Sequence, residues 1–393
     1  MYRFLMHFLA YGVLNIGTVS AQDTLYTYYP NQKIKEKICG SLHSGDTLKN
    51  GRYEFYSSDG WLNHQGNYKN NSLHGEYFIF YSNGTLKTKY QFVDGKKEGT
   101  YSVFDGYKNR IEEGYFHEDL LDGVKKKYSS SGKPEEISSF KEGKKEGFQW
   151  VYGIQGHIIS KIEYKGDSVN GIFEMFYDDG NLNYRGKKIG KNYVDSLVVF
   201  YLSGDTLRKC FYKDGKIEGL LKSYYEHGKP QMIYQYIGGN LEGDFIEYFP
   251  DGTIAQKGQY TNNKKTGIWK AYYPTGTLFS IGEFKNSRFY GEWIIYYEGG
   301  QLKQKGIYFD GIAYNQWTYC HPNGIVWKRG YYCNDKQDGF WTIYTEQGIL
   351  ENVVWFQHGT MQGFAVAMQD DGWQKLLVKN GEAIPVLEEA KTE

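Results

Sequence analysis

A glycine period constrains this chain more than any other feature. Steps of 24 residues from Gly51 to Gly363 meet fourteen positions, and all are glycine except Asp195 and Asn315. Asp and Asn are the side chains that best tolerate a positive φ, so the exceptions fit the same backbone conformation as the glycines. We call these residues anchors and number each repeat from its anchor as position 0. The period predicts a repeat architecture with a recurrent left-handed residue.

Other positions keep the same phase. Position 9 is usually glycine, often as Asp59-Gly60 or Asn83-Gly84, a dipeptide typical of hairpin turns. Positions 5 and 6 carry aromatic pairs such as Tyr272-Tyr273, and position 17 is aromatic in most repeats. We expect a strand of about six residues just after the anchor and a loop of about four residues ending at position 9. A second strand and a charged turn such as 95–99 then complete the repeat.

Composition agrees with an all-β fold. The 393 residues include 49 Gly, 39 Tyr, 23 Phe and 9 Trp, which suits short strands joined by tight turns. One hairpin cannot bury its own apolar face, so successive hairpins must stack. The predicted fold is an elongated single-layer, solenoid-like ribbon of about 14–15 consecutive hairpin repeats of 24 residues.

The repeat array is predicted over residues 51–383. Residues 22–50 read as a degenerate capping repeat, displaced by four residues near His43, and residues 384–393 as a disordered tail. Repeats are least regular from Gly123 to Thr206, where Lys125, Gln149 and Lys188 stand in place of aromatics. We still expect one continuous array.

The first 21 residues differ from the rest. Arg3 is their only charge, the following stretch is mostly apolar, and small residues lead to Ala21. This pattern predicts a signal peptide at residues 1–21, with cleavage near Ala21 and export to the periplasm or beyond the cell. The stretch is short for an uncleaved membrane anchor, which is the alternative. The four cysteines occupy different repeat positions, which favours incidental thiols over a disulfide framework, and they are Cys39, Cys210, Cys320 and Cys333.

Several repeats also contain Gly-x-aromatic-x-x-turn residue-x-x-x-Gly. Two instances are Gly66-Tyr68-Asn71-Gly75 and Gly258-Tyr260-Asn263-Gly267. This spacing resembles the core of the MORN repeat, and the longer unit is similar to the variant in bacterial proteins of the YwqK-type antitoxin family. The resemblance implies an interaction scaffold, in some members associated with membranes. Its antitoxin branch implies a toxin as the partner.

Catalytic patterns are missing from the sequence. It has no His-Glu-x-x-His, paired Cys-x-x-Cys, EF-hand loop, phosphate-binding loop or nucleophile elbow. His117-Glu118-Asp119 is expected to be a solvated turn rather than a metal site. Lys+Arg and Asp+Glu are both 46, which argues against nucleic-acid binding by bulk charge. We therefore expect no enzyme activity, no metal and no cofactor.

Two repeated features can bind a partner. One is a lysine row in the return turns. Four of its five members are followed two residues later by an acid, which largely offsets the charge, so a solvated edge is favoured over contact with anionic lipid or polymer. The row comprises Lys96, Lys144, Lys216, Lys264 and Lys336. The other feature is the aromatic rows in the most regular repeats. The candidate binding surface is Trp269, Trp293, Trp317 and Trp341 with Tyr272, Tyr296, Tyr319 and Tyr344.

The expected partner of this surface is another protein. Stacked aromatic side chains also suit sugars, so cell-envelope polysaccharide is the alternative ligand. The position 2 tryptophans must then be exposed, which makes their burial the deciding observation.

Overall fold

The computed structural model describes residues 23–43, 46–369, 372–379 and 382–385. The chain forms two compact units, residues 1–168 and residues 169–393, which are described separately below. The predicted signal peptide lies outside the described residues. Among the described residues, no helix has the length and apolar character needed to cross a membrane.

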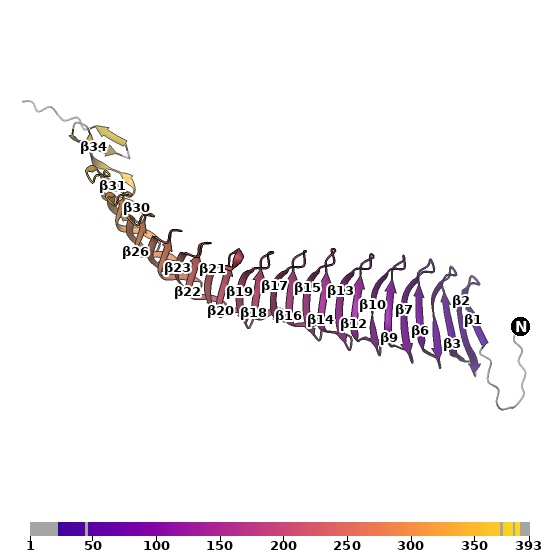
Figure 1. Ribbon diagram of the computed structural model, residues 1–393. Helices are drawn as coiled ribbons and strands as arrows, with labels where there is room; N and C mark the ends of the chain where they lie inside the picture. Colours follow the sequence, from indigo (N-terminus) through magenta and orange to yellow (C-terminus); the bar gives the residue numbers. More distant parts are fainter. Residues whose placement is uncertain (1–22, 44–45, 370–371, 380–381, 386–393) are drawn as a thin grey trace, which may run out of the picture. The chain divides into compact units, whose positions relative to one another are not determined.

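The N-terminal unit is a succession of antiparallel hairpins, each strand pairing with its neighbour in the chain (Figure 1). Some first strands are split into two short pieces near the anchor. The strands are β1 (Asp23–Tyr28), β2 (Ile34–His43), β3 (Asp46–Tyr56), β4 (Leu62–Lys69), β5 (Ser72–Leu73), β6 (Gly75–Phe80), β7 (Leu86–Val93), β8 (Lys96–Lys97), β9 (Gly99–Phe104), β10 (Arg110–His117), β11 (Leu120–Leu121), β12 (Gly123–Tyr128), β13 (Pro134–Lys141), β14 (Lys144–Tyr152) and β15 (Ile158–Lys165).

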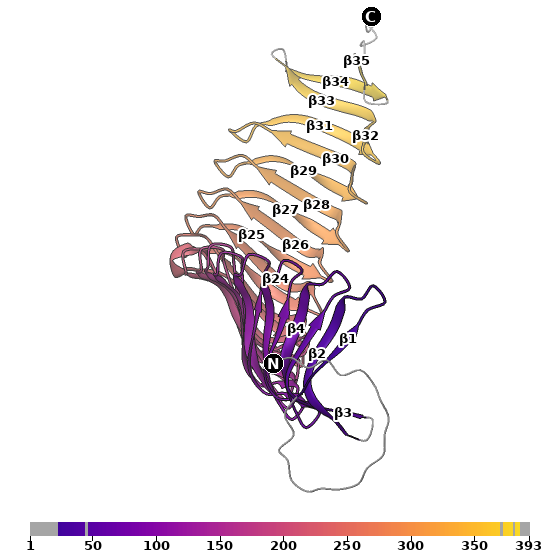
Figure 2. The ribbon, with the colours of Figure 1, turned by 90° about the vertical axis from the view of Figure 1, so that its right-hand side faces the viewer.

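The C-terminal unit repeats the same hairpin, with the two kinds of turn along opposite edges of the sheet (Figure 2). β16 (Ser168–Phe176) starts at the boundary between the units. The later elements are β17 (Leu182–Ile189), β18 (Asn192–Phe200), β19 (Thr206–Lys213), β20 (Lys216–Tyr224), a 3-10 turn at Glu226–Gly228, β21 (Pro230–Ile237), β22 (Asn240–Tyr248), β23 (Ile254–Thr261), β24 (Lys264–Tyr272), β25 (Leu278–Lys285), β26 (Arg288–Tyr296), β27 (Leu302–Phe309), β28 (Ile312–Cys320), β29 (Val326–Cys333), β30 (Lys336–Tyr344), β31 (Leu350–Gln357), β32 (Thr360–Met361), β33 (Gly363–Gln369), β34 (Gly372–Lys379) and β35 (Glu382–Pro385).

In the repeats from Gly51 to Gly348, the first turn closes as a three-residue loop. In the repeat anchored at Gly51, the Ser57 amide donates to the Trp61 carbonyl and the Gly60 amide donates to the Ser57 carbonyl, both at 2.9 Å. Gly60 has φ of 98°, the left-handed residue that such loops need. Lys108 adopts φ of 73° at this position in the one repeat without glycine there. The predicted loop ending at position 9 is confirmed.

The return turn is tighter than the sequence suggested. Val93 pairs with Lys96, so only Asp94 and Gly95 remain in the turn, with φ of 48° and 86°. Two positive φ values in a two-residue turn define the type I′ geometry, whose twist matches that of the flanking strands. The predicted charged turn over residues 95–99 is therefore wrong, because Lys96 and Lys97 already belong to β8.

The anchor lies inside the first strand rather than in front of it. Ser138 pairs with Gln149 and Phe140 with Lys145, so three residues including Gly147 face the single residue between Ser138 and Phe140. This bulge requires a left-handed residue, and every anchor has a positive φ, including Asp195 at 64° and Asn315 at 63°. The left-handed position is confirmed. The start of the strand was misplaced, because it begins three residues before the anchor.

The predicted capping repeat is a hairpin with longer arms. β2 has 10 residues and β3 has 11, compared with 8 and 9 in a regular repeat such as β13 and β14. Two extra residues on each arm account for the displacement by four. At the other end, Ile384 and Pro385 belong to β35, so the predicted tail starts too early. Residues 386–393 lie outside the described residues.

One face of the sheet carries the core, and we call it the inner face. In the C-terminal unit, Trp317 and Trp341 pack there with the partly buried Tyr308, Tyr332 and Phe356. In the irregular middle of the N-terminal unit, polar groups replace these rings. Gln149 donates to the Glu136 carboxylate at 2.8 Å, and both Gln149 and Ser138 are buried. The hairpin array thus continues through repeats in which polar side chains replace part of the aromatic core.

Candidate functional site

The tryptophan row is buried, which corrects its prediction as a binding surface. Trp269, Trp317 and Trp341 are only 3%, 3% and 1% exposed, and Trp293 is partly buried. Each ring meets the position 17 aromatics edge-on, as Trp341 meets Tyr332 at 5.2 Å between centroids. Tyr272, Tyr296, Tyr319 and Tyr344, the tyrosines predicted beside the row, are half-buried.

Glycine at position 15 explains why tryptophan fits on this face. Each of the four tryptophans covers the glycine eleven residues earlier, and a Cβ on that glycine would overlap the indole. The pairs are Gly258 with Trp269, Gly282 with Trp293, Gly306 with Trp317 and Gly330 with Trp341. A single-layer sheet has no second layer, so the ring fills the space against the backbone and serves as core. The row is therefore mainly core and not an exposed aromatic surface.

The paired lysines that follow the return turn direct their side chains to different faces. The first lysine of each pair, such as Lys264, is exposed, as are the other four members of the predicted row. The second turns onto the inner face, where the Lys265 ammonium lies 3.9 Å from the Trp269 ring centroid. Burial lowers the pKa of Lys265. The second lysine thus belongs to the core by a cation–π contact.

The acids that follow the lysines have a structural task. The Glu98 carboxylate accepts the Glu118 backbone amide at 2.9 Å, and this bond together with His117 lowers the Glu98 pKa. Glu146, Glu218 and Asp338 accept the amide twenty residues later in the same way. They hold the next turn in place rather than only offset lysine charge. His117-Glu118-Asp119 is confirmed as such a turn, since Glu118 and Asp119 both have positive φ.

A second set of bonds joins the other edge. The position 6 tyrosine donates its hydroxyl to the position 5 carbonyl of the next repeat, and we call this contact the tyrosine bridge. Tyr81 donates to Phe104, Tyr177 to Phe200, Tyr201 to Tyr224, Tyr225 to Tyr248, Tyr273 to Tyr296 and Tyr297 to Cys320, at 2.8–2.9 Å. The aromatic pairs found in the sequence are thus partly explained by one ring that joins neighbouring repeats.

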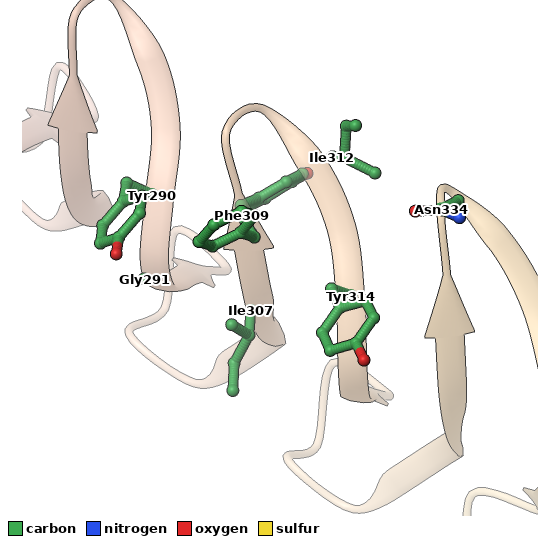
Figure 3. A pocket seen from close by; sticks show the side chains of 8 residues that line it. Tyr290, Gly291, Ile307, Phe309, Ile312, Tyr314 and Asn334 are labelled. Atoms are coloured by element: carbon green, nitrogen blue, oxygen red, sulfur yellow. The ribbon is translucent and has the colours of Figure 1, made fainter.

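An exposed apolar hollow lies on the outer face of the C-terminal unit (Figure 3). Its volume is about 480 Å³. Phe309 is 62% exposed, Tyr314 51% and Ile312 40%, which is unusual for side chains of this size. Its residues come from β26, β27 and β28 and the turn at Asn334. The lining comprises Tyr290, Gly291, Ile307, Tyr308, Phe309, Ile312, Tyr314 and Asn334.

The hollow recurs one repeat later. A second hollow, of about 440 Å³, shares Tyr314 and otherwise carries residues shifted by 24, such as Tyr331 after Ile307 and Cys333 after Phe309. It retains the acid Asp338 at the place of Tyr314 in the first hollow. Tyr290 and Tyr314 occupy position 23, where other repeats place the carboxylate that holds the next turn. Replacing that acid by tyrosine makes this edge apolar. Sequence reasoning missed the site, although aromatics at positions usually occupied by Glu, Asp or Gln were a readable signal.

Other sequence candidates are not brought together. The four cysteines are free thiols, and Cys210 and Cys320 are buried. Within the described residues, no group of three or more His, Cys, Asp or Glu side chains is arranged to hold a metal ion.

Comparison with known families decides the identity of the repeat. The model described as MORN repeat variant matches seven segments, residues 49–70, 73–94, 121–142, 217–237, 241–262, 265–286 and 289–310. This chain is a MORN-repeat protein. MORN repeats are generally protein- or membrane-interaction repeats. None of the curated proteins matches the chain.

Solved structures align with the MORN array at low similarity. The crystal structure of TcdB2-TccC3 aligns over 92% of this chain and 25% of its own, with 11% identity and a TM-score of 0.17. The Photorhabdus luminescens Tc holotoxin pore aligns over 91% and 24%, with 12% identity and a TM-score of 0.16. This chain thus spans about a quarter of the chains that it matches.

Proposed function

We propose that this chain is an exported, non-catalytic scaffold that binds a protein partner through the outer-face hollow. The observation that carries the proposal is the exposure of Phe309, Ile312 and Tyr314 around one apolar depression. An aromatic lining without charged side chains suits apolar residues of a polypeptide. The general role of MORN repeats in interactions supports the same class of function.

The spacing of the two hollows indicates which conformation a bound polypeptide segment would have. Successive repeats add two strands, so equivalent points on neighbouring repeats are about 10 Å apart. A polyproline II segment advances about 3.1 Å per residue and presents every third residue on one side, at about 9 Å. An apolar segment with proline in this conformation can place one side chain in each hollow. Tyrosine-lined grooves of this kind are a recurring way to hold such segments.

A crosslinking experiment on the exported full chain tests this proposal. A photoreactive phenylalanine analogue at Phe309 should capture a protein whose crosslinked peptide is proline-containing and apolar. The same analogue at Phe211, which is 45% exposed in another repeat, is the matched control and should capture none. Phe309→Asp should abolish binding of the captured segment, supplied as a synthetic peptide, whereas Phe211→Asp should not. Equal capture at both positions, or a segment without such residues, would contradict the protein-binding proposal.

The alternatives give different results. Retention of cell-envelope polysaccharide that is lost in Phe309→Asp would assign the hollow to a glycan. Export itself is tested by N-terminal sequencing of the exported fraction, where a start at Gln22 supports it. Recovery of the chain only from the cytoplasm, bound to a toxin, would favour the antitoxin alternative.

A further inference from the structure

The tyrosine bridge is interrupted in three successive repeats of the N-terminal unit. Position 6 is occupied there by Asp105, Ser129 and Gly153 instead of tyrosine. In the middle repeat, no tyrosine hydroxyl is present to donate to the Tyr152 carbonyl. The short Ser129 side chain instead forms hydrogen bonds within its own loop, with Ser131 and Lys133. The Tyr152 carbonyl thus lacks the tyrosine hydroxyl donor that the same carbonyl receives in bridged repeats.

A depression of about 500 Å³ lies at this interruption. It is bordered on one side by Ser129 and Lys133 and on the other by Tyr152 and Ile154, the same parts of two neighbouring repeats that a bridging tyrosine joins elsewhere. In bridged repeats the position 12 side chain covers the ring, as Lys87 covers Tyr81 at 5.5 Å from the ring centroid. The depression therefore has the location of an absent tyrosine side chain and borders its hydroxyl acceptor.

Two loops beside the depression carry a large apolar side chain that is almost fully exposed. Tyr107 is 89% exposed and Ile154 is 98% exposed, and they belong to the loops of the repeats on either side of Ser129. The tips of regular loops carry polar residues such as Ser58-Asp59 and Ser82-Asn83. Apolar tips at this interruption offer contacts to the residues that flank an inserted side chain, which favours a polypeptide over a free small phenol.

We propose that the depression at Ser129 binds a tyrosine side chain of a partner polypeptide, whose hydroxyl donates to the Tyr152 carbonyl. The partner thereby supplies the bridge that the chain itself lacks. The site belongs to the N-terminal unit and does not depend on the outer-face hollow. It is tested with different residues, so either proposal can fail alone.

The probe is the capped tripeptide acetyl-Gly-Tyr-Gly-amide, titrated into the full chain with labelled methyl groups. The side chains of Val151 and Ile154 line the depression, and their methyl resonances should shift when the peptide binds. The matching Phe peptide should bind about fivefold more weakly, because it lacks one hydrogen bond to a carbonyl. Ser129→Tyr should fill the site, raise Tm and abolish the shifts, and Ser129→Phe should also abolish them.

Ser82→Tyr places a tyrosine in a regular loop and serves as the control, with shifts equal to those of the unmodified chain. Three results would overturn the proposal. They are the absence of Val151 and Ile154 shifts up to the solubility limit of the peptide, unchanged shifts in Ser129→Tyr, and equal affinity for the Phe peptide.

Discussion

The indole of Trp341 lies against the backbone of Gly330, eleven residues earlier in the chain, and leaves no room for a Cβ there. The Trp341 ring nitrogen donates to the Tyr331 carbonyl at 3.2 Å, which fixes the ring over that strand. The core of a one-layer sheet thus depends on pairing the smallest residue on one strand with the largest residue on the neighbouring strand.

Gly330→Ala should therefore lower the free energy of unfolding by about 1–3 kcal/mol through overpacking. Gly330 does not have a positive φ, so the effect is steric. Gly106→Ala is the matched control, because a Cβ at Gly106 has no atom within 4 Å. Chemical denaturation measures both. Equal stability of the two variants would contradict the contact.

The burial of the tryptophan row predicts a stability effect from its removal. Trp317→Ala should lower the free energy of unfolding by about 3–5 kcal/mol, the usual range for removal of a large core side chain. Phe309→Ala, at an exposed ring of the hollow, should cost less than about 1 kcal/mol. Thermal unfolding distinguishes them. If Trp317→Ala unfolds like the unmodified chain, the ring is not part of the core.

The tyrosine bridge predicts that removing a bridging hydroxyl lowers stability and that adding one raises it. Tyr201→Phe removes the hydroxyl that donates to Tyr224 and should cost about 0.5–1.5 kcal/mol. Phe249 is a natural phenylalanine at the same position, so Phe249→Tyr should add a bridge and raise Tm. A decrease in Tm for Phe249→Tyr would show that the bridge does not stabilise its repeat.

The anchors of two repeats test the left-handed backbone position. Asn315 has φ of 63°, where an L-residue without a local hydrogen bond is strained. Asn315→Ala should lower the free energy of unfolding by about 1–2 kcal/mol, whereas Asn315→Gly should leave it close to that of the unmodified chain. Gln316→Ala, next to it, is the control with little change. Identical unfolding curves for the Ala and Gly variants would argue against a strained anchor.

The lowered pKa of Glu98 predicts a pH-dependent contribution to stability. Because the folded pKa lies below the usual 4.5, the ionised carboxylate stabilises the fold above that pH. The benefit is lost as pH falls through the lower folded value. The stability difference between the unmodified chain and Glu98→Gln should therefore be larger at pH 6 than at about pH 3. Glu346→Gln, in a hairpin loop, is the control, and a difference independent of pH would contradict the role of Glu98.

The repeat and its left-handed positions were readable from the sequence because both depend on local backbone conformation. Asp195 and Asn315 identified the anchor as surely as the glycines did. The sequence could not place the anchor within the strand, since a bulge and a turn demand the same φ. Only the pairing of Ser138 with Gln149 distinguishes them.

The candidate surface was misassigned for a different reason. The period shows that Trp293 and Trp317 share a face, but it does not say which face water reaches. That answer lies in the glycines at position 15, whose missing side chains let the rings lie flat. Tyr290 and Tyr314 stand where several other repeats have an acid. The role of that acid is not visible in the sequence, because its carboxylate binds a backbone amide twenty residues later, as Glu98 binds the amide of Glu118.

The bonds between repeats span 20–23 residues, as Glu98 to Glu118 and Tyr201 to Tyr224 illustrate. Contacts of such short range in sequence carry little loop-closure cost and favour rapid folding. A repeat thus needs only the next one to complete its bonds. The chain can then acquire structure progressively, one hairpin at a time, while later residues are still being made or threaded through a narrow channel.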